Sequence, residues 1–319
     1  MEESVKKLHE KRVKMWDKSI ANHKKYINND TGLFEKKWVE HRVCPVCEKN
    51  TYIKIFKKEG GEYVKCLECS MVYTNPVFTN DALTDYYKNN HTEQSQIVES
   101  DTDNFYINLY NKGLDSIEKT SKIGNILDIG CSSGIFLDAA KKRNWQTNGI
   151  ELNQKEFEVT QKKGHTAYNQ LLENITFKEK FNAISMWDVF EHIKDGQKYL
   201  NQMGNLLTKE GVIFLQIPSS DSLAAKILQE KCNMFDGLEH VNLYGVDTIK
   251  LLAQKCGLKV LSLNTVISEI GILNNYLNYE HPYFGSTKNK EFIPNLLDEK
   301  AIHENLMGYK LQVVLGKEK

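Results

Sequence analysis

Short apolar stretches alternate with amphipathic ones from about residue 124 almost to the end of the chain. The apolar stretches predict strands at 125–129, 146–150, 183–187, 212–217 and 259–263, a short one near 165–168 and a last one near 309–315. The stretches between them predict helices at 134–143, 154–163, 196–207 and 247–256. Repeated strand–helix units of this spacing are typical of an α/β fold, a Rossmann-like doubly wound parallel sheet with helices on both faces.

Three segments of different character precede this region. Residues 1–42 are rich in Lys and Glu and predict a loosely amphipathic helical segment. Residues 43–79 contain two cysteine pairs among short β-type runs, and residues 80–123 return to a helical, tyrosine-rich pattern. Residues 124–319 then form the large domain, with an insertion at 218–246 and a carboxyl-terminal extension at 265–308.

The stretch ILDIGCSSGIF, residues 126–136, follows the first strand of the large domain and opens its first helix. Gly130 and Gly134 permit a tight turn and the close approach of a ligand. Glu151, at the end of the next strand, can accept hydrogen bonds from both hydroxyls of a ribose. The G-x-G-x-x-G spacing of a nicotinamide site is incomplete, and Asp128 would repel a pyrophosphate. The loop therefore favours an adenosine cofactor without phosphates.

At these residues the chain resembles the class I S-adenosylmethionine-dependent methyltransferases. The resemblance covers about residues 124–264 and rests on ILDIGCSSGIFL, NGIELN and FNAISMWDVFEHIKDGQKYLNQMGNLLTKEGVIFLQIPSS. Ser132 departs from it, because the family often has a second glycine there. The resemblance implies S-adenosylmethionine as cofactor, bound by Asp128, Gly130, Cys131, Gly134, Glu151, Leu152, Trp187, Asp188 and Val189.

The cysteines form two C-x2-C pairs separated by eighteen residues. Four thiolates at this spacing predict a tetrahedral Zn²⁺ site in a zinc ribbon, with iron as the alternative. A site closed by four protein ligands leaves no position for a substrate, which favours a structural role over an RNA grip. Residues 44–78 carry five Lys and four Glu, a poor charge balance for phosphate contacts. The four ligands are Cys44, Cys47, Cys66 and Cys69.

The order of cysteine pairs and methyltransferase motifs resembles a bacterial subgroup that includes zinc-containing sugar and surface-polysaccharide methyltransferases. This resemblance implies a small acceptor, a sugar or sugar nucleotide. O-methylation is slightly favoured over C- or N-methylation. It also implies that residues 80–123 contribute to the cofactor cleft. It does not identify the acceptor or the oligomeric state.

Two histidines are candidates for the group that accepts the acceptor's proton, because imidazole titrates near neutral pH. His192 follows a predicted strand in WDVFEHI, and His240 lies in the insertion, in DGLEHVNLYG. His281 is a weaker candidate. Cys131, Cys232 and Cys256 have no sequence feature of a nucleophile.

Charge and hydropathy set the remaining expectations. Lys plus Arg and Asp plus Glu both total 42, so nothing indicates a general attraction to nucleic acid or membranes. No apolar run is long enough to span a membrane, and charges occupy the place of a signal peptide's apolar core. Reduced cysteines suit the cytoplasm. The alternatives are an RNA-modifying methyltransferase and a non-enzymatic binding protein with a degenerate fold.

Overall fold

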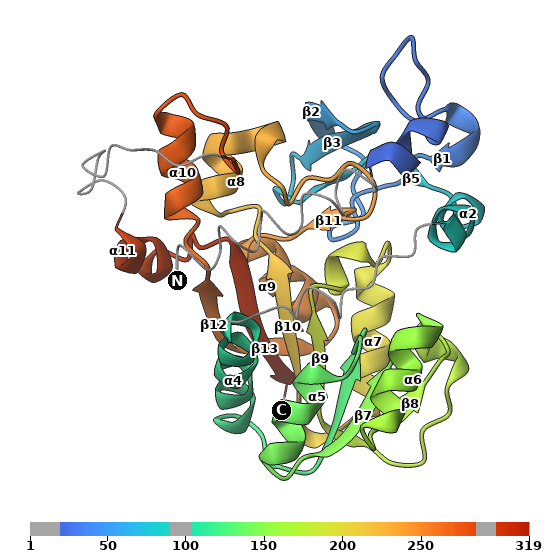
Figure 1. Ribbon diagram of the computed structural model, residues 1–319, viewed down its shortest axis with the longest axis vertical. Helices are drawn as coiled ribbons and strands as arrows, with labels where there is room; N and C mark the ends of the chain where they lie inside the picture. The colour runs from blue at the N-terminus through green and yellow to red at the C-terminus, as the bar shows by residue number, and fades with distance from the viewer. Residues whose placement is uncertain (1–19, 90–103, 285–297, 319) are drawn as a thin grey trace.

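The computed structural model describes residues 20–89, 104–284 and 298–318 (Figure 1). Its largest element is a seven-stranded sheet in the order β12-β13-β10-β9-β6-β7-β8. The apolar runs that predicted strands all lie in it, within a few residues of the expected bounds. Its strands are β6 (Asn125–Ile129), β7 (Gln146–Ile150), β8 (Thr166–Tyr168), β9 (Phe181–Trp187), β10 (Leu207–Pro218), β12 (Leu258–Val266) and β13 (Lys310–Lys317).

Strand β13 departs from the all-parallel expectation. It lies between β10 and β12 and runs antiparallel to both, whereas β6 runs parallel to β7 and β9. Strand β12 ends and β13 begins at the same edge of the sheet. Because the two strands are antiparallel, their connection does not have to cross the sheet. Six strands therefore end at one edge of the sheet, and β13 begins there.

Helices cover both faces of the sheet, as predicted. On one face, apolar residues of α4 (Phe105–Glu118) and α5 (Ile135–Lys142) pack on alternate residues of β6, β9 and β10. On the other face, α7 (Gly196–Leu206) and α9 (Val246–Lys255) bury Leu200, Met203 and Leu252. Helix α6 (Gln154–Lys162) packs beside β8. No helix of the described ranges is long and apolar enough to cross a membrane.

A second sheet joins the cysteine-bearing segment to the large domain. Its order is β11-β4-β3-β2, formed by β2 (Tyr52–Lys58), β3 (Gly61–Cys66), β4 (Val72–Thr74) and β11 (Asn242–Leu243). Strand β11 belongs to the insertion 218–246 and pairs antiparallel with β4. Figure 1 places this sheet above the edge where the parallel strands end. The insertion thus belongs to the large domain in sequence and contributes a strand to the second sheet.

The helical prediction for residues 1–42 is wrong over most of its described part, and residues 1–19 lie outside the described residues. After a short helical stretch at 20–26 the chain turns at Asn28, whose side-chain oxygen accepts hydrogen bonds from the amides of Asp30 and Thr31. Such a side chain competes with helix formation. Two short elements follow, a 3-10 turn (Lys36–Trp38) and β1 (Val39–Glu40), which pairs with β5 (Val77–Phe78).

The helical prediction for 80–123 holds within the described residues, as α2 (Asn80–Asn89) and α4. Tyr86 of α2 is buried in a small core with Tyr26, Phe34, Phe78 and Leu238 of the insertion. Elements that the sequence did not predict lie in the insertion and extension: α8 (Leu223–Leu228), α10 (Ile270–Leu277) and α11 (Glu299–Glu304).

Candidate functional site

The loop after β6 has the tight geometry that its glycines predicted. Gly130 has φ +77° and Gly134 has φ +76°, both in the left-handed region. A Cβ atom on Gly130 would lie 2.6 Å from Cγ2 of Val189, so the end of β9 packs directly against the loop. Two of the predicted cofactor residues, Gly130 and Val189, are therefore neighbours.

Ser132 also adopts the left-handed region, with φ +48°. A residue with a side chain is strained there, whereas glycine is not. Hydrogen bonds on both sides hold the peptide: its amide donates to Glu151 at 2.8 Å, and its carbonyl accepts from the Thr160 hydroxyl at 2.7 Å. The serine thus retains the backbone conformation that a glycine would adopt more easily.

Asp128 closes β6 beneath this loop and is almost fully buried. Its Oδ1 accepts a hydrogen bond from the Ser185 hydroxyl at 2.7 Å. Burial, reinforced by the negative charge of Glu151 and opposed by the Ser185 hydrogen bond, raises the pKa of Asp128 to about 8. A carboxyl held in this way favours a cationic ligand, which would stabilise its ionised form.

Glu151 lies at the end of β7, beside the loop. Its two carboxylate oxygens accept hydrogen bonds from the amides of Ser132 at 2.8 Å and Asn153 at 2.7 Å. Burial raises its pKa, and these amides act in the opposite direction. Each oxygen has a second lone pair, so the carboxylate can still accept hydrogen bonds from a diol.

The other predicted cofactor residues differ in their surroundings. Leu152 is exposed at 56% and lies next to Glu151, where an apolar ring could cover it. Cys131 is buried under the loop, against Gly149 of β7. Trp187 packs among aromatic rings of the helical face, with Tyr110 at 4.8 Å and Phe214 at 4.7 Å between ring centroids.

Asp188 forms a polar network with residues that the sequence analysis did not identify. Its Oδ2 accepts hydrogen bonds from Lys310 of β13 and from Gln216 of β10. The signals available were a lysine in the apolar run YKLQVVLG of β13 and a glutamine in the apolar run VIFLQI of β10. The lysine faces the site only once β13 is placed in the sheet. Oδ1 of Asp188 is buried and has no hydrogen-bond partner among the described residues.

The two candidate histidines meet although 47 residues separate them in the chain. The ring centroids of His192 and His240 lie 4.8 Å apart, in an edge-to-face arrangement. Glu191, fully buried, brings Oε1 to 3.9 Å from Nε2 of His240. Both oxygens of Glu191 lack a hydrogen-bond partner in the part of the chain that the structure describes. Sequence reasoning missed Glu191.

Opposite electrostatic influences act on these histidines. Burial and the neighbouring His240 lower the pKa of His192 to about 4. Burial also lowers the pKa of His240, but the carboxylates of Asp236 and Glu191 outweigh it and raise that pKa above its ordinary value. Nδ1 of His240 lies 2.7 Å from the carbonyl oxygen of Met234. This contact turns Nε2 toward Glu191.

The cysteine-bearing unit positions the segment that carries His240. The buried Tyr63 hydroxyl of β3 donates to the carbonyl of His240 at 3.2 Å and accepts from the amide of Gly237 at 3.1 Å. Arg42 donates to the carbonyl of Val241 at 2.7 Å and to that of Lys194 at 3.2 Å. Tyr63 thus attaches the insertion to the second sheet, and Arg42, just before the first cysteine pair, holds the residue that follows the histidine.

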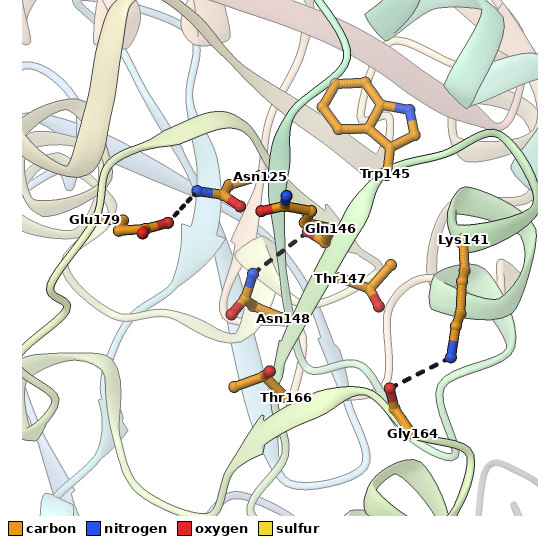
Figure 2. Close-up of a pocket in the computed structure, with 9 residues that line it drawn as sticks. All are labelled: Asn125, Lys141, Trp145, Gln146, Thr147, Asn148, Gly164, Thr166 and Glu179. Carbon is orange, nitrogen blue, oxygen red and sulfur yellow. Dashed lines mark hydrogen bonds between the residues drawn. The ribbon is translucent and has the colours of Figure 1, made fainter.

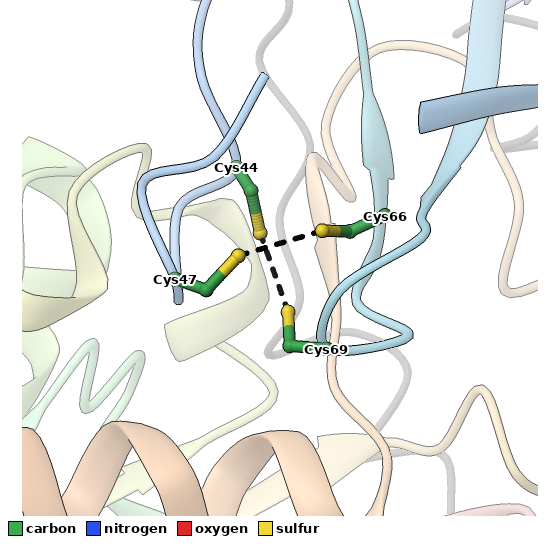
Figure 3. A group of neighbouring side chains, drawn as sticks. All are labelled: Cys44, Cys47, Cys66 and Cys69. Atoms are coloured by element: carbon green, nitrogen blue, oxygen red, sulfur yellow. Dashed lines mark hydrogen bonds between the residues drawn. The ribbon is translucent and has the colours of Figure 1, made fainter. Parts of the chain in front are cut away.

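The four cysteines converge as predicted (Figure 3). The Sγ atoms of Cys44 and Cys69 are 3.5 Å apart, and those of Cys47 and Cys66 are 3.4 Å apart. Disulfide sulfurs would be far closer, whereas thiolates on one tetrahedral Zn²⁺ lie roughly 3.8 Å apart. The group could hold a zinc ion.

A hollow of about 390 Å³ lies at the opposite edge of the large sheet (Figure 2). It is lined by polar residues near the beginnings of strands, among them Asn125 of β6, Gln146 of β7 and Thr166 of β8. Ligands of parallel α/β sheets bind beyond the carboxyl ends of the strands. This hollow is therefore not the candidate site.

Comparison with known proteins adds a family match. The family model described as "Methyltransferase domain" matches residues 102–263. A ubiquinone biosynthesis O-methyltransferase of Pelagibacter ubique (strain HTCC1062) is 29% identical over 108 residues, 31% of this chain and 44% of that protein. The corresponding protein of Actinobacillus pleuropneumoniae serotype 7 (strain AP76) is 27% identical over 101 residues, 28% of this chain and 43% of that protein. The chain thus matches less than half the length of these curated relatives.

Two solved structures are also similar. An S-adenosylmethionine-dependent methyltransferase from Clostridium acetobutylicum ATCC 824 superposes with a TM-score of 0.47 at 14% identity, covering 70% of this chain and 96% of that one. The plantazolicin methyltransferase BpumL, in complex with a triazolic analogue and SAH, gives a TM-score of 0.48 at 15% identity, with coverages of 74% and 92%.

Proposed function

The chain belongs to the methyltransferase-domain family, and from this premise we propose that it transfers a methyl group from S-adenosylmethionine to a small acceptor at the edge where β6, β7 and β9 end. This proposal rests on one observation: a single loop links Asp128 and Glu151, the two carboxylates that were predicted to bind the cofactor. Glu151 accepts a hydrogen bond from the amide of Ser132, four residues after Asp128.

The residues at this edge fit the cofactor in three respects. The peptide turn at Gly130 leaves no side chain between β6 and a ligand. Glu151 retains lone pairs for ribose hydroxyls, and the exposed Leu152 offers an apolar surface for the adenine. Oγ of Ser133 is buried without a hydrogen-bond partner among the described residues, so a ligand group could satisfy it. Bound here, S-adenosylmethionine supplies an electrophilic methyl group on a sulfonium.

We propose a hydroxyl acceptor, a sugar or sugar nucleotide. The cysteine unit and the insertion enclose the edge beside Asp188 and leave a histidine there whose side chain is 23% exposed. The curated relatives are named as O-methyltransferases, which supports oxygen as the methylated atom. In this proposal His240 orients the hydroxyl and receives its proton at Nε2, while Met234 fixes the ring through Nδ1.

We further propose that the four cysteines hold a structural Zn²⁺. Burial raises the pKa of the Cys44 thiol to about 11, so a bound cation would keep this sulfur as a thiolate. The closed ligand set leaves no place for the acceptor. The zinc would instead stabilise the sheet from which Tyr63 holds the segment of His240.

Calorimetric titration with S-adenosylhomocysteine tests the cofactor assignment. We expect binding by the wild type, strong loss in Asp128→Ala and Glu151→Ala, and no change in Glu158→Ala, an exposed glutamate of α6. Incubation with S-adenosylmethionine and a panel of sugar nucleotides, catechols and oligoribonucleotides then tests the acceptor. Absence of nucleoside binding would favour the non-enzymatic alternative, and methylation of RNA alone would replace the sugar proposal.

A further inference from the structure

We propose that Glu191, His192 and His240 form a second metal site, separate from the four cysteines, which binds a divalent transition-metal ion with open coordination positions beside Asp188. One ligand atom from each residue lies within 4.8 Å of the others. The metal-bound atoms of His and Glu lie roughly 2.0–2.2 Å from the ion, so tetrahedral ligand atoms lie roughly 3.3–3.6 Å apart. Closing the site therefore requires the ligand atoms to approach one another by about an ångström.

The state of Glu191 is the strongest reason for a ligand here. The residue is fully buried, and neither carboxylate oxygen has a hydrogen-bond partner within the described ranges. A buried carboxylate without partners is strongly disfavoured. The nearest cationic group is the imidazole of His240, whose Nε2 is 3.9 Å away, too far for a hydrogen bond. A metal ion between them would satisfy both groups.

The ring of His240 is held as those of metal ligands usually are, with one nitrogen occupied by a backbone carbonyl, and the ring of His192 packs against it. Nδ1 of His240 lies 2.7 Å from the carbonyl oxygen of Met234. The ring of His192 packs edge to face against that of His240, with 4.8 Å between the ring centroids. Such contacts fix the ring orientation and leave the other nitrogen for the metal.

The charges around the cluster favour a cation. Oδ2 of Asp236 lies 3.7 Å from Nδ1 of His240, and Asp188 directly follows β9, three residues before Glu191. Lys310 is hydrogen-bonded to Asp188 and offsets part of this negative charge. Two carboxylates therefore lie beside the cluster, Asp188 from the end of β9 and Asp236 from the insertion. Two imidazoles and one carboxylate suit Zn²⁺, Fe²⁺ or Co²⁺ better than Mg²⁺.

The chemical consequence rests on the proposed function. An acceptor hydroxyl bound to this ion would lose its proton to solvent more readily. Its oxygen would then attack the methyl carbon, so that a C–O bond forms while the C–S bond breaks and its electron pair passes to sulfur. His240 would in that case act as a ligand, and the ion would replace its role as proton acceptor.

Titration of the zinc-loaded full chain with Co²⁺, followed by visible absorption, tests the site. Thiolate ligands give cobalt intense charge-transfer bands in the near ultraviolet, and imidazole and carboxylate ligands do not. We expect one Co²⁺ bound without these bands, at least about tenfold weaker binding in Glu191→Gln and His240→Gln, and wild-type binding in His41→Gln, which changes an exposed histidine.

The proposal is overturned if the wild type takes up no Co²⁺ outside the cysteine cluster, or if all three variants bind it equally. The wild-type result alone decides the first point, whether or not a variant folds. Calorimetry with S-adenosylhomocysteine on the same samples separates the two proposals. Nucleoside binding without Co²⁺ uptake refutes only the metal site, and Co²⁺ uptake without nucleoside binding supports the metal site and refutes the proposed function.

Discussion

Asp128 should make the protein less stable as the pH rises from 5 to 8. Its pKa is raised from 3.8 to about 8 in the folded chain, mainly by burial. A group whose folded pKa lies above its unfolded pKa contributes stability below the unfolded value and loses it as pH rises toward the folded value. The unfolded chain ionises first, and the free energy of unfolding falls by about 1.4 kcal/mol per pH unit. Between pH 5 and 8 the loss from this residue approaches about 4 kcal/mol.

Asp128→Asn isolates this contribution, because the amide keeps an oxygen to accept the Ser185 hydroxyl and cannot ionise. Urea unfolding of both proteins at a fixed zinc concentration, followed by tryptophan fluorescence, gives the free energy of unfolding at each pH. We expect the advantage of the variant over the wild type to grow by about 3–4 kcal/mol from pH 5 to pH 8. In the exposed control Asp30→Asn, the free energy of unfolding should change with pH by the same amount as in the wild type. A constant difference for Asp128→Asn would refute the reasoning.

Three further changes test other parts of the structure. Ser132→Gly should raise the free energy of unfolding by about 0.5–1 kcal/mol in urea titrations, because it relieves the left-handed strain. Tyr63→Phe should lower it by about 1–3 kcal/mol and speed hydrogen exchange of residues 236–241, because two hydrogen bonds are lost. Removal of zinc by a chelator, or Cys69→Ser, should lower the thermal midpoint and speed hydrogen exchange of the same residues. An unchanged exchange rate would show that the zinc does not stabilise the segment of His240.

The elements that were predicted best are those that a local sequence pattern determines. The loop from Asp128 to Gly134 and the strands of the large domain are encoded by neighbouring residues, because side-chain period and turn chemistry act over a few positions. The four cysteines could be identified because metal ligation requires fixed spacing. Leu152 and Val189 followed from the family resemblance, and their contact with a cofactor stays a prediction.

What could not be predicted depends on contacts between distant segments. The antiparallel entry of β13 determines that Lys310 reaches Asp188, and no local pattern specifies it. The approach of His240 to His192 requires the pairing of β11 with β4. Glu191 was overlooked because a glutamate in a polar loop gives no sign of burial until the insertion covers it.

The pairing of β11 with β4 also governs the order of events during synthesis. When β2, β3 and β4 have left the ribosome, the edge of β4 that will bind β11 still has unpaired backbone groups, and the residues that fill this place emerge only after most of the large domain. A nascent chain, or a fragment cut between β10 and β11, carries this edge open to pairing with other chains. The protein should therefore depend on chaperones more than a domain whose sheets close locally, and its halves should not be expressible as independent fragments.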